Sequence, residues 1–210
     1  MSYAVKEIFK TLQGEGAHMG RAAVFCRFAG CNLWSGREAD RAASVCTFCD
    51  TDFVGMDGTG GGRFSDADAL ADAIETEWGA SADNHYVVLT GGEPLLQVDD
   101  MLVEALHRRG FEIGVETNGT QVAPTGIDWI CVSPKADAPL AITSGNELKL
   151  VFPQPSAPPE KFAGLAFDNF FLQPMDATDA DANLAATIAY CTDNPRWRLS
   201  LQAHKMIGIR

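Results

Sequence analysis

The sequence predicts an α/β fold, a partial, open βα barrel of about six parallel strands and about three long helices. Short apolar runs alternate with helical segments along the middle of the chain, which is typical of parallel βα units. A length of 210 residues falls short of the roughly 250 that a closed barrel of eight units usually takes. We therefore expect one domain, residues 1–210.

The strands are predicted from short apolar runs bounded by turn residues. These runs are residues 22–28, 86–89, 111–115, 129–132, 148–152, 170–172 and 197–201. The stretch 87–89 is apolar on both faces, as expected of a strand covered on both sides. An opening run, residues 3–9, is expected to add an edge strand.

Helical periodicity and plausible caps predict three helices. They are residues 65 or 66 to 78, residues 98 to 109 ending at Gly110, and about 181 to 191. Two stretches rich in glycine or proline, residues 58–62 and 153–159, are expected to be exposed connections.

Polar residues follow five of the predicted strands, at 90–93, 116–118, 133–135, 173–176 and 202–205. The carboxyl ends of parallel barrel strands meet at one rim, where barrel active sites lie. An active site at that rim is therefore predicted, although polar turn residues also occur at strand ends without any catalytic role.

The charge balance narrows the class of partner. With 16 Lys and Arg against 28 Asp and Glu, the formal net charge is −12, which disfavours nucleic acid and anionic membranes as partners. The sequence shows neither a signal-peptide pattern nor a run of roughly 18 apolar residues. We expect a cytoplasmic protein.

Cysteines crowd into residues 26–49, where four of the six lie. In a reducing compartment such a cluster indicates a metal rather than disulfides. Cys31, Cys46 and Cys49 have the spacing Cx14CxxC, which suits a 4Fe-4S cluster with one iron left open for a ligand. Zinc is the alternative, with Cys26 or His18 as its fourth ligand.

The remaining cysteines are interpreted as structural. Cys26 lies inside an apolar strand and shares a face with Val24 and Phe28, so it is more simply a small buried side chain. Cys131 and Cys191 lie in predicted strand and helix and are also expected in the core.

Seven separated motifs occur in order along the chain. They are TLQGEG at 11–16, RFAGCNLW at 27–34, CDT at 49–51, TGGEPL at 90–95, ETNG at 116–119, SPK at 133–135 and QPMD at 173–176. Together they resemble the 7-carboxy-7-deazaguanine synthases, a family of the radical S-adenosylmethionine (SAM) superfamily. The common superfamily spacing is Cx3CxxC; here Ser35 stands at the second cysteine's place, so residues 35–45 are expected to be an insertion in the cluster loop.

The resemblance implies that 6-carboxy-5,6,7,8-tetrahydropterin is contracted to 7-carboxy-7-deazaguanine with loss of ammonia, in the biosynthesis of queuosine and other 7-deazapurines. It also implies a 4Fe-4S cluster on Cys31, Cys46 and Cys49, SAM, and Mg²⁺ at Thr51. A reductant such as flavodoxin or ferredoxin and a homodimer are the further implied partners.

Site residues are assigned by the same resemblance. For SAM they are Phe48, Cys49, Asp50, Gly92, Ser133, Pro134, Lys135, Gln173, Pro174, Met175 and Asp176. For the pterin they are Leu12, Gln13, Gly14, Glu15, Arg27, Thr90, Asn118, His204 and Arg210. Glu116 is the candidate for moving a proton during the rearrangement.

Several of these residues also have structural interpretations. Arg27 alternates with Phe25 in an apolar strand, so it needs either an anionic ligand or a structural partner such as Glu15. Glu93 could simply lie at the first turn of a helix, where the helix dipole favours a carboxylate.

Two other functions remain open from the residues. A glycyl-radical activating enzyme would share the cluster but would not need the pocket formed by residues 12–15 and Arg27. A zinc-stabilised binding module would be colourless and indifferent to dithionite.

Overall fold

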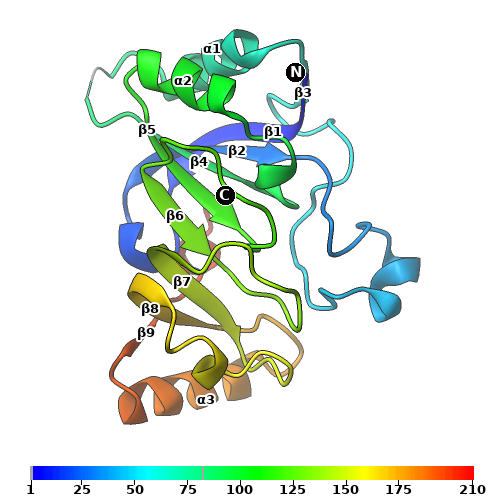
Figure 1. The fold of residues 1–210 in the computed structure, drawn as a ribbon, viewed down its shortest axis with the longest axis vertical. Helices are drawn as coiled ribbons and strands as arrows, with labels where there is room; N and C mark the ends of the chain where they lie inside the picture. Colours follow the sequence, from blue (N-terminus) through cyan, green and yellow to red (C-terminus); the bar gives the residue numbers. More distant parts are fainter. Residues whose placement is uncertain (1, 82) are drawn as a thin grey trace.

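The computed structural model describes residues 2–81 and 83–210, which fold around one curved sheet that does not close (Figure 1). Within these residues the sheet has nine strands in the order β3-β1-β2-β4-β5-β6-β7-β8-β9. The strands are β1 Tyr3–Leu12, β2 Ala22–Phe28, β3 Gly62–Phe64, β4 Tyr86–Gly91, β5 Glu112–Thr117, β6 Trp129–Val132, β7 Ser144–Phe152, β8 Ala166–Pro174 and β9 Trp197–Leu199. All neighbouring pairs from β2 to β9 are parallel. The predicted open βα barrel is confirmed.

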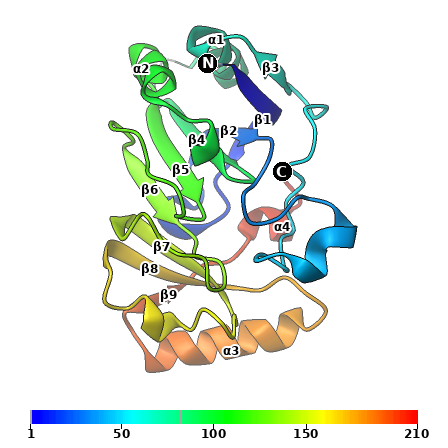
Figure 2. The same ribbon diagram turned by 45° about the vertical axis from the view of Figure 1, so that its right-hand side comes forward.

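Three long helices cover the outer face of the sheet, as predicted. They are α1 Ala67–Trp78, α2 Asp100–Arg108 and α3 Ala180–Asp193. Figures 1 and 2 show α1 and α2 beside one end of the sheet and α3 beside the other. Asp66 and Asp99 cap α1 and α2 by accepting hydrogen bonds from the backbone of Ala69 and Leu102, at 2.9 and 3.0 Å.

Several shorter helical segments complete the fold. Five of them were not predicted from the sequence: α4 Ala203–Ile207, which follows β9, and the 3₁₀ turns η1 Gly16–His18, η2 Glu38–Ala43, η3 Pro94–Leu96 and η4 Pro159–Lys161. No helix within residues 2–81 and 83–210 is long and apolar enough to cross a membrane.

The two faces of the sheet differ in chemistry because successive side chains of a strand point to opposite sides. On the outer face Val87, Leu89 and Ile113 belong to the buried core that α1 and α2 cover. On the inner face Thr90 and Glu116 line a cavity. The alternation within each strand therefore separates the core from the site.

The opening strand is not an edge strand, because β3 pairs with it in antiparallel fashion. The glycines at 58–62, predicted to be a free connection, lie against β1 instead. The backbone N–H of Ile8 donates to the carbonyl of Thr59 at 2.8 Å, and that of Gly58 to the carbonyl of Lys6 at 3.0 Å. A Cβ at Gly61 would lie 2.1 Å from the carbonyl oxygen of Lys6, so only glycine permits this approach.

The stretch 153–159 is only partly exposed, which also corrects the prediction. Gln154 and Ala157 are buried. The Gln154 side chain accepts a hydrogen bond from the backbone of Ala136 at 3.0 Å and donates to the carbonyl of Val151 at 2.8 Å. The Gln154 amide thereby gives hydrogen-bond partners to a backbone N–H of the loop that follows β6 and to a carbonyl of β7.

Candidate active site

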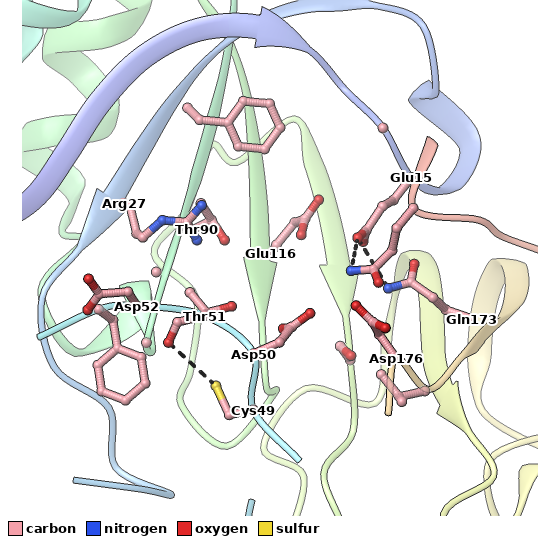
Figure 3. A pocket seen from close by; sticks show the side chains of 18 of the residues that line it. Glu15, Arg27, Cys49, Asp50, Thr51, Asp52, Thr90, Glu116, Gln173 and Asp176 are labelled. Carbon is pink, nitrogen blue, oxygen red and sulfur yellow. Dashed lines mark hydrogen bonds between the residues drawn. The ribbon is translucent and has the colours of Figure 1, made fainter. Parts of the chain in front are cut away.

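A cavity of about 370 Å³ lies inside the curve of the sheet, at the carboxyl ends of its parallel strands (Figure 3). The predicted rim site is therefore present. With one exception, every predicted site residue lines this cavity. The exception is Pro134, which is buried and turns its carbonyl toward Gln154, at 3.4 Å. Ser133 and Lys135, on either side of it, face the cavity, as the alternation of an extended segment requires.

The three predicted cluster cysteines, Cys31, Cys46 and Cys49, line one region of the cavity. The Leu33 backbone N–H donates to the Cys31 sulfur at 3.4 Å, and the Cys49 thiol donates to the carbonyl of Thr51 at 3.9 Å (Figure 3). A hydrogen bond from the Cys46 thiol lowers the pKa of Cys49 to about 6. The same contact raises the pKa of Cys46.

The candidates for a fourth zinc ligand lie elsewhere. Cys26 is fully buried in the core, and His18 packs on Trp129 and bonds to the Tyr86 hydroxyl at 3.0 Å. In the described part of the chain, no three His, Cys, Asp or Glu side chains surround a point that could hold a single metal ion. Three thiols in one cavity fit a 4Fe-4S cluster, in which each thiolate binds a different iron.

The glycine turn after β4 packs directly on the loop that carries Cys31. A Cβ at Gly92 would lie 2.1 Å from the carbonyl oxygen of Gly30 and 2.8 Å from Cβ of Cys31. The next residue, Glu93, donates its backbone N–H to the same Gly30 carbonyl at 2.9 Å. Gly92 is therefore required for close contact between two parts of the site.

Glu93 is structural, as its position near a helical first turn predicted. Its buried carboxylate accepts hydrogen bonds from the backbone of Leu95 and Asn118, at 3.0 and 2.8 Å, and from the Thr117 hydroxyl at 2.7 Å. Burial raises its pKa in spite of these donors. The Asn118 side chain continues outward and donates to Asn32 at 3.0 Å, which joins β5 to the cluster loop.

Arg27 has a structural partner, but it is Glu7 and not Glu15. Glu7 lies directly opposite Arg27 in the antiparallel pairing of β1 and β2, and Nε of Arg27 lies 2.8 Å from the Glu7 carboxylate. In Figure 3 the guanidinium extends toward Thr90. Glu7, which also pairs with Arg210, was missed. The available signal was that Glu7 lies two residues before Phe9, so a charged side chain shares one face of β1 with an aromatic one.

Glu15 and Glu116 share a cation that the sequence analysis missed. Nζ of Lys149, on β7, lies 2.6 Å from Glu15 and 3.4 Å from Glu116. Gln13 donates to Glu116 at 2.8 Å, so the catalytic candidate is held from two sides. Burial favours a raised pKa for Glu15, but the charge and the hydrogen bond of Lys149, together with the hydrogen bond from Gln202, outweigh it and the pKa is lowered. The two carboxylates together raise the pKa of Lys149 against its burial.

The residues assigned to SAM divide into two groups. Lys135 donates to the carbonyl and the hydroxyl of Ser133, at 2.7 and 2.5 Å, and burial lowers the pKa of Lys135. Gln173 instead donates to Glu15 at 3.2 Å and accepts from Ser200 at 3.3 Å. Its side chain therefore lies with the residues assigned to the pterin.

The C-terminal segment, residues 203–210, forms one wall of the cavity, which agrees with the predicted place of residues 202–205 at the rim and of His204 and Arg210 in the pocket. Lys205 on α4 bridges Asp50 and Asp176, at 2.8 and 2.6 Å. The backbone N–H of Ala203 donates to the carbonyl of Gly14 at 3.0 Å, and a Cβ at Gly14 would lie 2.3 Å from His204.

Comparison with known proteins agrees with this geometry. The Radical SAM superfamily model matches residues 40–143. Proteins named 7-carboxy-7-deazaguanine synthase from Bradyrhizobium diazoefficiens and Caulobacter vibrioides are 69% and 65% identical to the chain, each over the full length of both proteins. The solved structure of QueE from Escherichia coli superposes with a TM-score of 0.72 at 29% identity, and it covers 97% of this chain and 95% of its own.

An open barrel with three cysteines at its rim, matched by these relatives, defines a radical SAM enzyme. Membership of that superfamily implies a 4Fe-4S cluster and SAM. Within it, the chain belongs to the 7-carboxy-7-deazaguanine synthase family.

Proposed function

We propose that the enzyme converts 6-carboxy-5,6,7,8-tetrahydropterin into 7-carboxy-7-deazaguanine with loss of ammonia, as a cytoplasmic step in queuosine and 7-deazapurine biosynthesis. Full-length identity to proteins named for this product supports the proposal. The observation that carries it is that one cavity is lined by the cluster cysteines and also by Arg27 and by the linked group of Glu15, Lys149 and Glu116. Such a cavity can hold a radical source next to a small polar substrate.

The polar network suits a pterin that carries a carboxylate. Arg27 offers charged donors to that carboxylate, and Thr90 lies beside it. Gln13 and Glu15 can hydrogen-bond the edge of the fused ring, since an amide and a carboxylate match its alternating donors and acceptors. The further members of this pocket are Leu12, Gly14, Asn118, His204 and Arg210.

Glu116 is proposed to move a proton during the ring contraction. Gln13 and Lys149 fix its carboxylate at the cavity wall, which is the positioning that general acid–base catalysis needs. We expect Glu116→Gln to transfer deuterium from a substrate labelled at C6 into SAM while product formation stops. Glu112→Gln, at the opposite end of β5, should transfer deuterium and also form product at the normal rate. Product from Glu116→Gln at the normal rate would remove Glu116 from this role.

Two groups of residues would hold the cofactors, one for the cluster and one for SAM. When bound, the cluster and SAM supply one-electron chemistry that removes a hydrogen atom from the substrate. Cys31, Cys46 and Cys49 would ligate the cluster. Around SAM, Gly92 would let the backbone approach the methionine part, and Phe48 would pack near the adenine; the other proposed contacts are Cys49, Asp50, Ser133, Lys135, Pro174, Met175 and Asp176. Pro134 is not among them because it does not line the cavity, nor is Gln173, because its side chain bonds to Glu15.

Thr51 is proposed as the protein ligand of Mg²⁺. Its neighbours Asp50 and Asp52 are paired with Lys205 and Lys6, at 2.8 and 2.9 Å. Magnesium keeps several waters and needs few protein ligands, so one hydroxyl and the substrate carboxylate would be enough. A flavodoxin or ferredoxin as reductant and a homodimeric assembly complete the proposal.

The test is anaerobic reconstitution with iron and sulfide, followed by incubation with SAM, a reductant and the carboxylated pterin. We expect a reducible 4Fe-4S paramagnetic signal that SAM perturbs, and 7-carboxy-7-deazaguanine as the product. Cys49→Ala should abolish both, whereas Cys191→Ala, on α3, should abolish neither. SAM cleavage without consumption of the pterin would refute the proposed substrate, and bound zinc with no cluster would refute the radical chemistry.

A further inference from the structure

The insertion in the cluster loop, residues 35–45, projects from the barrel and contains the turn η2 (Figure 2). The segment that follows, from Cys46 to Asp50, is irregular backbone. Its carbonyls are bonded by side chains of the insertion. Arg41 Nη1 donates to the carbonyls of Thr47 and Cys49, at 3.1 and 3.0 Å, and the Ser44 hydroxyl donates to that of Cys46 at 3.0 Å.

Arg41 is itself fixed from two directions. Its Nε lies 2.8 Å from the Glu38 carboxylate, and its guanidinium lies 4.1 Å from the ring centroid of Trp34. Trp34 is 8% exposed and packs edge-on against Phe53, with ring centroids 5.6 Å apart. The indole N–H of Trp34 donates to the carbonyl of Arg37 at 3.2 Å, which ties the insertion back to the same ring.

A continuous set of contacts therefore runs from the buried Phe53 through Trp34 and Arg41 to the backbone carbonyls of Thr47 and Cys49. We call this set of contacts the clamp. Only a planar, forked cation can donate to two carbonyls, bond a carboxylate and stack on an indole at once. The contacts also bring a fixed positive charge to the backbone carbonyls of Thr47 and Cys49, within the segment that carries two of the cluster cysteines.

We propose that Arg41 is a positioning residue for the iron–sulfur cluster, and that the insertion functions by holding Arg41 in this position. The clamp holds Cys46 and Cys49 at their ligating positions. Its charge stabilises the reduced cluster, which carries one more negative charge than the oxidised form, and so raises the reduction potential. The inference depends on the radical SAM class of the enzyme and not on the identity of its substrate.

The test compares Arg41→Gln and Arg41→Lys with Arg37→Gln in the full-length, anaerobically reconstituted protein. Arg37 is a matched control, because it is an exposed residue of the same insertion and contacts Trp34 through its backbone carbonyl. Two quantities are measured without any substrate: the midpoint potential of the cluster, and the rate at which a chelator removes its iron.

Arg41→Gln is expected to lower the midpoint potential and to release iron roughly 10–100 times faster, the range typical for loss of an outer contact to a metal ligand. Arg41→Lys should keep most of the potential but release iron faster, since one ammonium cannot serve both carbonyls. Arg37→Gln should match the wild type. A wild-type potential together with wild-type iron release in Arg41→Gln would overturn the proposal.

Glu38→Gln separates a specific effect from general misfolding. It removes the charge that orients the guanidinium but leaves the contacts between Arg41 and the loop carbonyls in place. We expect intermediate iron release and an unchanged thermal unfolding temperature of the apoprotein. If the rates of iron release in Glu38→Gln and Arg41→Gln only follow the loss of thermal stability of the apoprotein, the clamp does not act specifically on the cluster.

Discussion

At the scale of single residues, Arg27 combines a structural ion pair with the binding role proposed for it. Its Nε is bound to Glu7, while the guanidinium extends toward Thr90 in the cavity. Lysine keeps the charge but cannot make both contacts. We expect Arg27→Lys to raise the KM for the pterin roughly 10–100-fold, since a charged hydrogen bond contributes about 1.5–3 kcal/mol. Steady-state rates check this, with Arg63→Lys on β3 as the control, and an unchanged KM would contradict it.

Gly92 is the residue at which a single methyl group should disturb the cluster. The added Cβ would meet the backbone of Gly30 and Cβ of Cys31, so the cluster loop has to shift. We expect Gly92→Ala to lower the free energy of unfolding by about 1–3 kcal/mol and to reduce iron incorporation. Urea denaturation of the apoprotein and iron analysis measure the two effects. Gly164→Ala, where a Cβ meets nothing within 4 Å, should change neither.

At the scale of elements, β7 supplies the cation that holds together the end of β1 and the end of β5. Lys149 pairs with Glu15 and Glu116, and its removal leaves carboxylates in a buried setting without their counter-charge. We expect Lys149→Met to lower the free energy of unfolding by about 3–5 kcal/mol. Chemical denaturation measures this, and Lys161→Met on the exposed turn η4 is the control. A loss below 1 kcal/mol would show that the pair is not structural.

The same pair predicts how stability depends on pH. The folded-state pKa of Glu15 is lowered, so its contribution is present above the unfolded pKa and is lost as the pH falls through the folded value. Lys149→Met removes the lowering charge and leaves the effect of burial, so the folded-state pKa of Glu15 should rise above its unfolded value and the variant should lose stability as the pH rises through that pKa. Unfolding free energies measured across the acidic range for both proteins test the direction of this shift.

At the scale of the whole molecule, the cavity joins segments that are far apart in the sequence. Lys205 connects Asp50, after the CxxC pair, with Asp176, after β8. Without it the two carboxylates repel each other across the wall. We expect Lys205→Met to weaken SAM binding to the reconstituted enzyme by about tenfold, which corresponds to about 1.4 kcal/mol. Calorimetry measures this, and binding equal to that of Lys161→Met would contradict it.

Much of the fold could be predicted because strand and helix periodicity is local. The elements that were missed, β3 and α4, span three and five residues, and they form against β1 and Gly14 rather than by their own propensity. The cations missed at the site have the same explanation. Lys149 is 134 residues from Glu15 and Lys205 is 155 from Asp50, a separation that periodicity in one sequence does not bridge.

The wall formed by residues 203–210 is made after the other segments that line the cavity, and this fixes the order in which the parts of the site become available during synthesis. The hydroxyl of Thr11 bonds to the carbonyl of Arg210, a contact that forms only after residues 203–210 have been made. A ribosome releases Cys31, Cys46 and Cys49 well before Lys205 is made. The three thiols are therefore made before the wall that encloses them, and the cavity is complete only after residues 203–210 have been made.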